Sequence, residues 1–236
     1  MCGRFTLATS TEVVAEFFEL ASAPDIPPRY NIAPTQSVFA VVDAGESAPS
    51  ARASARRMLR TFHWGLVPAW AKDPSIGARM INARAETVAN KPSFRSAFRR
   101  RRCLIPADGF YEWQKPHDGK KGRKQPYCIR MADGRVFALA GLWERWEGAD
   151  GAAIESCTII TTTPNALIQP LHDRMPVILP RGDHALWLDP QVTDAGRVEP
   201  LLAPYPADGM DAHPVSTIVN NAANDTPLCC RPPSDL

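Results

Sequence analysis

The stretch Arg102-Cys103-Leu104-Ile105-Pro106-Ala107-Asp108-Gly109-Phe110-Tyr111-Glu112-Trp113 decides the fold class of this chain. It holds two short apolar runs, at residues 103–105 and 110–113, separated by turn-forming residues. Runs of this length between Pro, Asp and Gly are typical of β-strands joined by a turn. We therefore predict a strand, a turn and a second strand here.

Similar short runs continue in both directions from this stretch. We predict further strands at 38–42, 58–64, 127–131, 136–142, 158–162, 177–179 and 215–219. The Asp133-Gly134 pair predicts that 127–131 and 136–142 form a hairpin. Apolar spacing predicts helices at 11–21, 93–101 and 183–188, with a short helix after 80–86. Thr9 and Glu12 fit a capping box before the first helix.

Many short strands interrupted by short helices predict an α+β fold around an antiparallel or mixed sheet. The chain has 236 residues, of which 44% are hydrophobic, and this is enough for one large domain over 1–236. We expect a mobile surface loop at 43–57, which is rich in Ala, Ser and Arg, and a flexible tail at 225–236.

Composition also limits the function classes. No apolar stretch reaches the length of a membrane span, and no basic region followed by an apolar run marks a secretory signal, so we expect a cytoplasmic protein. The six cysteines lack metal-site spacing, which argues against zinc and against disulfides in a reducing compartment. A net charge of +2 is too small to indicate a nucleic-acid partner, so the distribution of the charge matters more.

The chain begins Met1-Cys2-Gly3-Arg4-Phe5. Removal of Met1 would leave Cys2 with a free α-amine, of ordinary pKa about 8, beside a thiol of ordinary pKa about 8.5. Each group would then supply a usable nucleophilic fraction near neutral pH. The alternative is that Cys2 is an inert small residue.

Three other places carry candidate polar side chains. Glu112 between Tyr111 and Trp113 either faces outward or lies in a pocket that raises its pKa. His172 stands beside an acid and a base that could set its tautomer, although a structural role is the alternative. Asn82 and Arg84 could project from one face of an extended segment or cap a loop.

Basic residues interleave with tryptophans in this chain. They are Arg4, Arg84, Lys91, Arg95, residues 99–102 and the loop at 115–124, with Trp64, Trp70 and Trp113. Phosphate contacts beside stacking surfaces are typical of a groove for single-stranded nucleic acid. The alternative is a solvated charged face.

Six motifs occur in an order that resembles the SOS-response-associated peptidase (SRAP) family. They are Met1-Cys2-Gly3-Arg4-Phe5, Arg29-Tyr30-Asn31-Ile32-Ala33-Pro34, Trp64-Gly65-Leu66-Val67-Pro68-Ala69-Trp70, Ile81-Asn82-Ala83-Arg84-Ala85-Glu86, the stretch quoted first, and His172-Asp173-Arg174-Met175-Pro176. The resemblance implies one compact domain with a curved, mainly antiparallel sheet core and a positively charged DNA channel. It also implies a function, which is shielding abasic sites in single-stranded DNA through a covalent crosslink.

The resemblance implies a role for each matching residue. Cys2 would be the crosslinking nucleophile once Met1 is removed, and the family name implies that this removal is an autoproteolytic step. Asn82 would orient Cys2, Glu112 would act as acid and base, and His172 would assist ring opening and reversal. Arg4 and Arg84 would bind phosphate, Thr161 would supply a hydroxyl, Trp70 would form the aromatic edge of the channel, and Asn31 and Pro34 would contribute to DNA binding. The chain departs from the family at Ala71, where a second aromatic is often found, and the Cys229-Cys230 pair matches no motif.

The chemistry of an N-terminal cysteine agrees with this expectation. The α-amine and thiol of Cys2 would close a thiazolidine ring on the aldehyde of an opened abasic sugar. We expect a monomer that uses no cofactor or metal. Three alternatives remain: an N-terminal-nucleophile amidohydrolase, although the chain has no Asn-Gly pair for an oxyanion hole; a cysteine peptidase with Cys2 and His172; and a single-strand binder that forms no covalent adduct.

Overall fold

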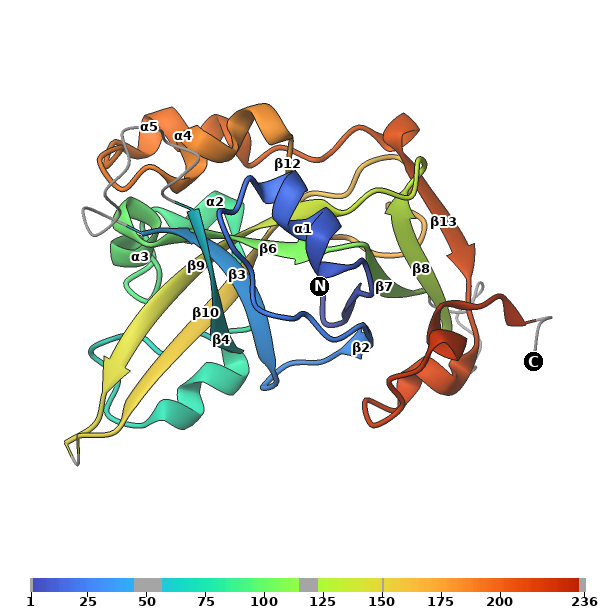
Figure 1. The fold of residues 1–236 in the computed structure, drawn as a ribbon, viewed down its shortest axis with the longest axis horizontal. Coiled ribbons are helices and arrows are strands. Elements are labelled where there is room, and N and C mark those ends of the chain that lie inside the picture. The colour runs from blue at the N-terminus through green and yellow to red at the C-terminus, as the bar shows by residue number, and fades with distance from the viewer. Residues whose placement is uncertain (1, 45–56, 115–122, 150, 234–236) are drawn as a thin grey trace.

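The computed structural model describes residues 2–44, 57–114, 123–149 and 151–233, and the strands within them form two sheets (Figure 1). The first sheet has the order β13-β8-β7-β1-β2, and every pairing in it is antiparallel. Its strands are β1 (Phe5–Leu7), β2 (Arg29–Ile32), β7 (Gly109–Gln114), β8 (Gln125–Met131) and β13 (Met210–Pro214).

The second sheet is larger and has the order β11-β10-β4-β3-β6-β9-β12, with β5 beside β10. Its strands are β3 (Ser37–Asp43), β4 (Arg57–Trp64), β5 (Asn82–Arg84), β6 (Arg102–Ala107), β9 (Phe137–Glu147), β10 (Ala153–Thr162), β11 (Met175–Pro176) and β12 (Ile178–Leu179). Only β4 and β5 run parallel to β10 among the described pairings. The predicted α+β class with a mainly antiparallel core is confirmed.

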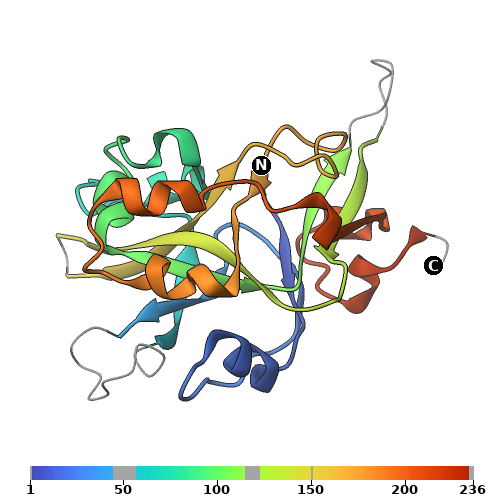
Figure 2. The same cartoon turned by 90° about the horizontal axis from the view of Figure 1, so that it is seen from above.

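Short helices flank the sheets. The α-helices are α1 (Thr11–Phe18), α2 (Ala85–Val88), α3 (Arg95–Arg100), α4 (His184–Leu188) and α5 (Ala195–Val198). The 3₁₀ helices include η3 (Pro74–Arg79), η5 (Arg181–Asp183), η6 (Glu199–Leu201), η7 (Ala207–Gly209), η8 (Thr217–Asn220) and η9 (Pro227–Cys230). Figures 1 and 2 show α3, α4 and α5 at one end of the molecule and the C-terminal segment beside β8 at the other. No described helix is long and apolar enough to cross a membrane.

Aromatic contacts join the two sheets. Phe5 on β1 meets Trp64 on β4 edge to face at 5.2 Å between ring centroids, and Phe110 on β7 meets Phe137 on β9 at 6.4 Å. Such pairs add about 0.5–1.5 kcal/mol beyond the area they bury. The strand, turn and strand predicted for residues 102–113 are β6 and β7. The two strands do not pair with each other: β6 belongs to the second sheet and β7 to the first.

The predicted hairpin between residues 127–131 and 136–142 is wrong. Gly134 does form a turn, since its φ is +73° and its N–H donates to the Met131 carbonyl at 3.0 Å. The strands on either side nevertheless separate, because β8 pairs with β7 and β13 whereas β9 pairs with β6, β10 and β12. Turn chemistry specifies the reversal of the chain but not the sheet that each strand joins.

Three further predictions need correction. The last strand is β13, at Met210–Pro214, and the segment predicted as a strand at 215–219 contains η8 instead. The capping box is absent, because Ser10 is the N-cap of α1 and the Thr9 hydroxyl donates to Asp108 at 2.9 Å. The tail expected at 225–236 is packed over residues 225–230: Asp225 accepts from the backbone N–H of Tyr30 and Asn31, and Cys229 is fully buried. Residues 231–233 are exposed, and residues 234–236 lie outside the described residues.

Two predicted loops fall mostly outside the described residues. For the loop at 43–57 these are residues 45–56, and for the basic loop at 115–124 they are 115–122. The ends of the first loop belong to strands, because Asp43 and Arg57 pair across β3 and β4.

Candidate active site

Cys2 lies just before β1 and is fully buried. Phe5 pairs with Phe110, and the antiparallel course continues beyond this pair because the Tyr111 N–H donates to the Arg4 carbonyl at 3.0 Å. The first residues of the chain therefore run alongside the end of β7 that carries Glu112. The sheet register, rather than sequence proximity, brings Cys2 to Glu112.

Asn82 reaches Cys2 from the other sheet. Its Nδ2 donates to the Cys2 carbonyl at 2.9 Å, while its Oδ1 is buried with no hydrogen-bond partner in the described part of the chain. The preceding carbonyl, that of Ile81, accepts from Trp64 Nε1 at 2.9 Å and from the Ile159 N–H at 3.1 Å. These two donors hold the start of β5 in place, so Asn82 is rigidly aimed at the chain terminus.

Glu112 is buried on β7, with 2% of the residue exposed. Burial, assisted by the nearby Asp173 carboxylate, raises the pKa of the Glu112 carboxyl to about 7. Of the two alternatives open from the sequence, the pocket is correct and the outward orientation is wrong. A carboxyl with this pKa can both donate and accept a proton near neutral pH.

His172 comes from the segment that follows β10. Its Nε2 lies 4.0 Å from Glu112 Oε2. Its Nδ1 lies 3.0 Å from the backbone N of Arg174 and 2.8 Å from the Asp173 carboxylate. The Arg174 N–H requires an unprotonated Nδ1 as its acceptor, whereas the carboxylate would require a hydrogen on Nδ1. We assign the neutral tautomer with its hydrogen on Nε2, because the backbone donor is fixed whereas the Asp173 side chain is 87% exposed and well solvated.

Arg174 anchors the His172 segment. Its guanidinium binds both oxygens of Glu86, at 2.6 and 3.0 Å, and also donates to the Thr161 carbonyl at 2.6 Å. A bidentate pair of this kind fixes orientation as well as charge. Arg174 and Glu86 both stand within the matched motifs, but no local residue pattern predicts this ion pair between them.

The surroundings of Cys2 disfavour the thiolate while Met1 is still attached. Burial and then the Glu112 carboxylate raise the pKa of the Cys2 thiol far above its usual range. While Met1 precedes it, the thiol therefore keeps its proton at neutral pH. The prediction of a usable thiolate fraction concerns the chain without Met1 and stays a prediction. A base must take the proton when the sulfur reacts.

Arg4 is held by a cage of oxygen acceptors. Its Nη1 donates to Asn31 Oδ1 and to the Val219 carbonyl, both at 2.8 Å, and its guanidinium lies 6.0 Å from the centre of the Trp113 ring. Partial burial lowers the pKa of Arg4. Trp113 is fixed in turn by a bond from its Nε1 to Asn220 at 2.7 Å.

Asn31 is fully buried and organises this cage. Besides accepting from Arg4, its Nδ2 lies within 3.1 Å of the carbonyls of Val219, Asn221 and Asn224. Asn31, which was expected to contribute to DNA binding, is buried beneath Arg4 and positions its guanidinium.

Replacing Asn31 with Ala is expected to lower the free energy of unfolding by about 2–3 kcal/mol, because it leaves a donor of the half-buried Arg4 and several buried carbonyl contacts unsatisfied. Urea denaturation of the variant measures this. Asn90→Ala, at an exposed position, is the matched control and should stay within about 0.5 kcal/mol of the wild type. Equal stability of the two variants would contradict the structural role of Asn31.

The other predicted site residues lie on several elements. Arg84 is exposed on β5 two residues after Asn82, and Trp70 is 59% exposed. Thr161 is fully buried on β10 opposite Arg84, with its hydroxyl 3.4 Å from the Ala83 carbonyl. Pro34 is half-buried in the turn after β2. Ala71 packs with Val67 and Trp146, so position 71 faces the interior.

Part of the predicted basic and aromatic surface belongs to the core. Arg102 is buried and donates to backbone carbonyls of Phe98, Arg99, Trp187 and Asp189. Arg101 pairs with Glu144 at 2.7 Å. Trp64 is fully buried. These three residues stabilise the fold, whereas Lys91, Arg95, Arg99 and Arg100 remain exposed.

The raised pKa of Glu112 predicts a pH-dependent cost to stability. The folded carboxyl holds its proton up to about pH 7, whereas the unfolded one releases it near 4.5, so the stability contributed by this group falls as pH rises between these values. Glu112→Gln should match the wild type at pH 4 and exceed it by about 3 kcal/mol at pH 8. Urea denaturation of both proteins at the two pH values tests this, and a constant difference would refute it.

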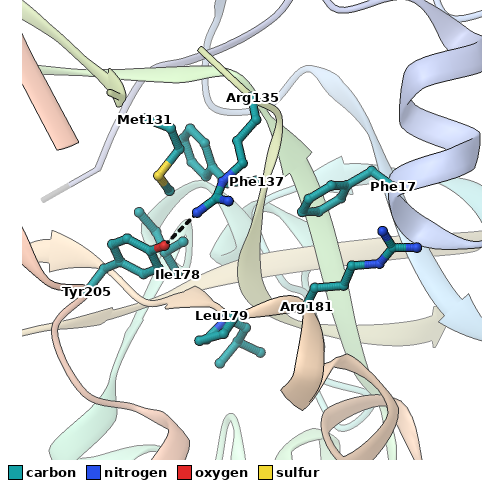
Figure 3. Close-up of a pocket in the computed structure, with 9 residues that line it drawn as sticks. Phe17, Met131, Arg135, Phe137, Ile178, Leu179, Arg181 and Tyr205 are labelled. Atoms are coloured by element: carbon teal, nitrogen blue, oxygen red, sulfur yellow. Dashed lines mark hydrogen bonds between the residues drawn. The ribbon is translucent and has the colours of Figure 1, made fainter. Parts of the chain in front are cut away.

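A separate cavity of about 440 Å³ opens elsewhere, between α1, β12 and the start of β9 (Figure 3). Arg135 donates there to the Tyr205 hydroxyl at 3.0 Å, and Arg181 lies over the Phe17 ring at 5.9 Å. None of its lining residues belongs to the cluster around Cys2. Among the described residues, no group of three or more His, Cys, Asp or Glu side chains is arranged to hold a metal ion.

Known proteins resemble this chain over nearly its whole length. Abasic site processing protein YoqW of Bacillus subtilis is 43% identical over 96% of this chain and 97% of its own length. Abasic site processing protein HMCES of Xenopus tropicalis is 34% identical over 86% of this chain and 65% of its own length. A solved structure from Bacteroides thetaiotaomicron superimposes with a TM-score of 0.83 at 25% identity, covering 98% of this chain and 99% of its own.

The family model described as SOS response associated peptidase matches residues 1–222. This range includes Cys2, Asn82, Glu112 and His172, which come from four separate segments and meet in one place. The chain belongs to the SOS response associated peptidase (SRAP) family.

Proposed function

We propose that this protein binds abasic sites in single-stranded DNA and captures them covalently through Cys2 after Met1 is removed. The observation that carries the proposal is the convergence of a terminal cysteine, an amide, a carboxyl of pKa about 7 and an imidazole in one partly buried cluster. The relatives named abasic site processing proteins support the choice of substrate.

The reaction begins with the sugar. An abasic deoxyribose is mostly a closed hemiacetal, and its aldehyde becomes available only when the ring opens with proton transfer. His172 Nε2 and Glu112 Oε2 lie 4.0 Å apart, so a sugar hydroxyl placed beside them could exchange protons with both. Asn82, with its buried Oδ1 lacking a partner in the described residues, can orient the terminal amine.

Two bonds then form on the same carbon. The Cys2 amine attacks the aldehyde carbon, and water leaves to give an imine. The thiol next adds across the carbon–nitrogen double bond, with Glu112 accepting the thiol proton and a proton passing to nitrogen. The second attack is intramolecular and closes a five-membered ring, which gives it a large effective concentration. The thiazolidine removes the iminium that would promote strand cleavage.

Two arginines and a tryptophan would hold the DNA strand. Arg84 is exposed and Arg4 is half-buried, and both can contact phosphates beside the sugar, while Trp70 offers an exposed ring on which a base can stack. Thr161 lies beside Arg84 in the sheet and is buried, so its contribution is to hold β5.

Denaturing electrophoresis tests the proposal and separates it from the alternatives. Incubation with an abasic single-stranded oligonucleotide should give a shifted band that survives denaturation, whereas an intact oligonucleotide should give none. A non-covalent binder would give no such band with either DNA. Hydrolysis of glutamine or of peptides in place of crosslinking would favour the amidohydrolase or the peptidase.

The role of Arg84 predicts a change in salt dependence. Arg84→Gln should weaken binding to single-stranded DNA and reduce the slope of log K against log salt concentration by about 1. Fluorescence anisotropy at several salt concentrations measures the slope. Arg197→Gln, at an exposed position on α5, is the matched control and should keep the wild-type slope. Equal slopes in both variants would exclude Arg84 from the phosphate contacts.

A further inference from the structure

A second group of thiols lies apart from the Cys2 cluster. Tyr111, Cys128, Val215, Val219 and Cys229 form a separate small core, and Cys230 packs against it from a half-buried position. The Cys229-Cys230 pair is the feature of the chain that neither the family motifs nor the proposed function uses. It lies on η9, in the C-terminal segment that Figures 1 and 2 show beside β8.

Cys230 contacts two groups of the first sheet. Its Sγ lies 3.0 Å from the Tyr111 hydroxyl, and Tyr111 pairs directly with Cys128 across β7 and β8, which brings the Cys128 thiol close enough to act on Cys230. The backbones around this contact are tied together, because Cys128 pairs with His213 across β8 and β13 and His213 Nε2 lies 3.1 Å from the Cys230 carbonyl. The two sulfur atoms are therefore neighbours in the folded chain although about a hundred residues separate them in sequence.

The two thiols differ in their electrostatics. Hydrogen bonds from Cys128 and from Tyr111 lower the pKa of Cys230, while burial opposes them. The pKa of Cys128 is raised well above its usual value, mainly by its hydrogen bond to Cys230 and by burial. A thiolate-prone, half-buried sulfur next to a protonated partner is the arrangement of a redox-sensitive pair.

We propose that Cys230 and Cys128 are a peroxide-reactive pair, in which Cys230 is oxidised first and Cys128 then closes a disulfide. In the first step the Cys230 thiolate attacks hydrogen peroxide: the sulfur–oxygen bond forms, the oxygen–oxygen bond breaks, and one proton is taken up to give sulfenic acid and water. In the second step the Cys128 sulfur attacks the sulfenic sulfur, and hydroxide leaves with the thiol proton as water. Two electrons pass from the sulfur atoms to one peroxide.

The neighbouring cysteines are poorer candidates. Cys229 is fully buried and donates to the Asn224 carbonyl at 3.3 Å, and burial raises its pKa. Cys103 and Cys157 are fully buried in the main core, with pKa values raised by burial. Oxidation should therefore be selective for one pair.

The disulfide would tie η9 to β8. The segment between β13 and η9 supplies the carbonyls of Val219 and Asn220 that hold Arg4. A covalent tie at its end should slow the opening of this segment without any change at Cys2.

Mass spectrometry of the full-length protein tests the proposal. The protein is treated with hydrogen peroxide, alkylated with iodoacetamide in denaturant and digested. We expect the peptide containing Cys128 to be linked to the peptide containing residues 229 and 230. Because those two cysteines share a peptide, Cys229→Ser is the assigning control and should form the link as the wild type does.

Two variants resolve the order of events. Cys128→Ser should accumulate a sulfenic acid on Cys230 that dimedone traps, whereas Cys230→Ser should give neither the link nor a dimedone adduct on Cys128. A wild-type protein whose Cys128 and Cys230 are both alkylated after peroxide treatment, or whose link involves Cys229, would overturn the proposal. The wild-type result stands even if a variant fails to fold.

Discussion

Cys2→Ala protein, with Met1 removed, is expected to form no denaturation-resistant complex with abasic DNA. The substitution deletes the sulfur that closes the ring but keeps a terminal amine, so only a reversible imine can form. Closure of the ring by a thiol on the same residue corresponds to an effective thiol concentration of about 10⁵ M or more. Without that thiol, the yield of stable product should fall below detection. Quantitative denaturing electrophoresis against the wild type measures the loss.

Borohydride and strand cleavage provide the matched readouts for this variant. Sodium borohydride should trap Cys2→Ala on the DNA as a reduced imine, and without borohydride the strand should break more often than with wild type because the iminium persists. Retention of Met1 should abolish the stable complex, since the nitrogen of Cys2 is then an amide and no thiazolidine can close. A wild-type yield of stable complex from Cys2→Ala would contradict the assignment of the nucleophile.

Glu112→Gln is expected to slow crosslinking by about 10²–10⁴-fold, the usual contribution of a positioned acid–base group. The thiol of Cys2 has a raised pKa, so its proton needs an acceptor, and the buried carboxylate is the group placed to take it. The wild-type rate should rise as pH passes through about 7, the pKa of this carboxyl. Single-turnover rates between pH 5 and 9 would show this inflection.

The variant should lose the inflection near pH 7 while binding the DNA as the wild type does. Glu147→Gln is the control for removing a carboxylate, because that side chain is 65% exposed and pairs with Arg145. An unchanged pH profile in Glu112→Gln would mean that another group transfers the proton. The same variant is expected to have a higher free energy of unfolding at pH 8. Together the two results would show that the buried Glu112 carboxyl lowers stability but accelerates crosslinking.

Local sequence patterns predicted the strands better than their partners. The runs at 38–42, 58–64 and 158–162 became parts of β3, β4 and β10, because β-branched and apolar alternation is a local property. Sheet membership depends on contacts distant in sequence, and the separation of β8 from β9 shows that a strong turn signal does not determine it. The segment at 215–219 has β-branched residues, yet it contains the start of η8. There the Val219 carbonyl accepts hydrogen bonds from Arg4 and Asn31 instead of from a neighbouring strand.

The reactive residues of the candidate site could be predicted from the sequence, but the residues that hold them in position could not. Cys2, Asn82, Glu112 and His172 stood out through residue type and the family motifs. Arg174 and the C-terminal segment did not, because their roles arise from bonds to groups far away in the chain. Arg102 illustrates the opposite error, since an arginine in a basic run looks exposed until the carbonyls that bury it are known.

The most direct test of the account is the covalent structure of the protein–DNA adduct. Crosslinked complex would be digested with protease and nuclease, alkylated with iodoacetamide and sequenced by tandem mass spectrometry. We expect an N-terminal peptide that lacks Met1 and carries the sugar on Cys2, with a mass equal to the sum of the peptide and the sugar fragment less one water. Its thiol should resist alkylation, and borohydride should add no hydrogen to it. An adduct on an internal lysine, a thioether on a chain that retains Met1, or a Cys2 thiol that can still be alkylated would contradict the thiazolidine.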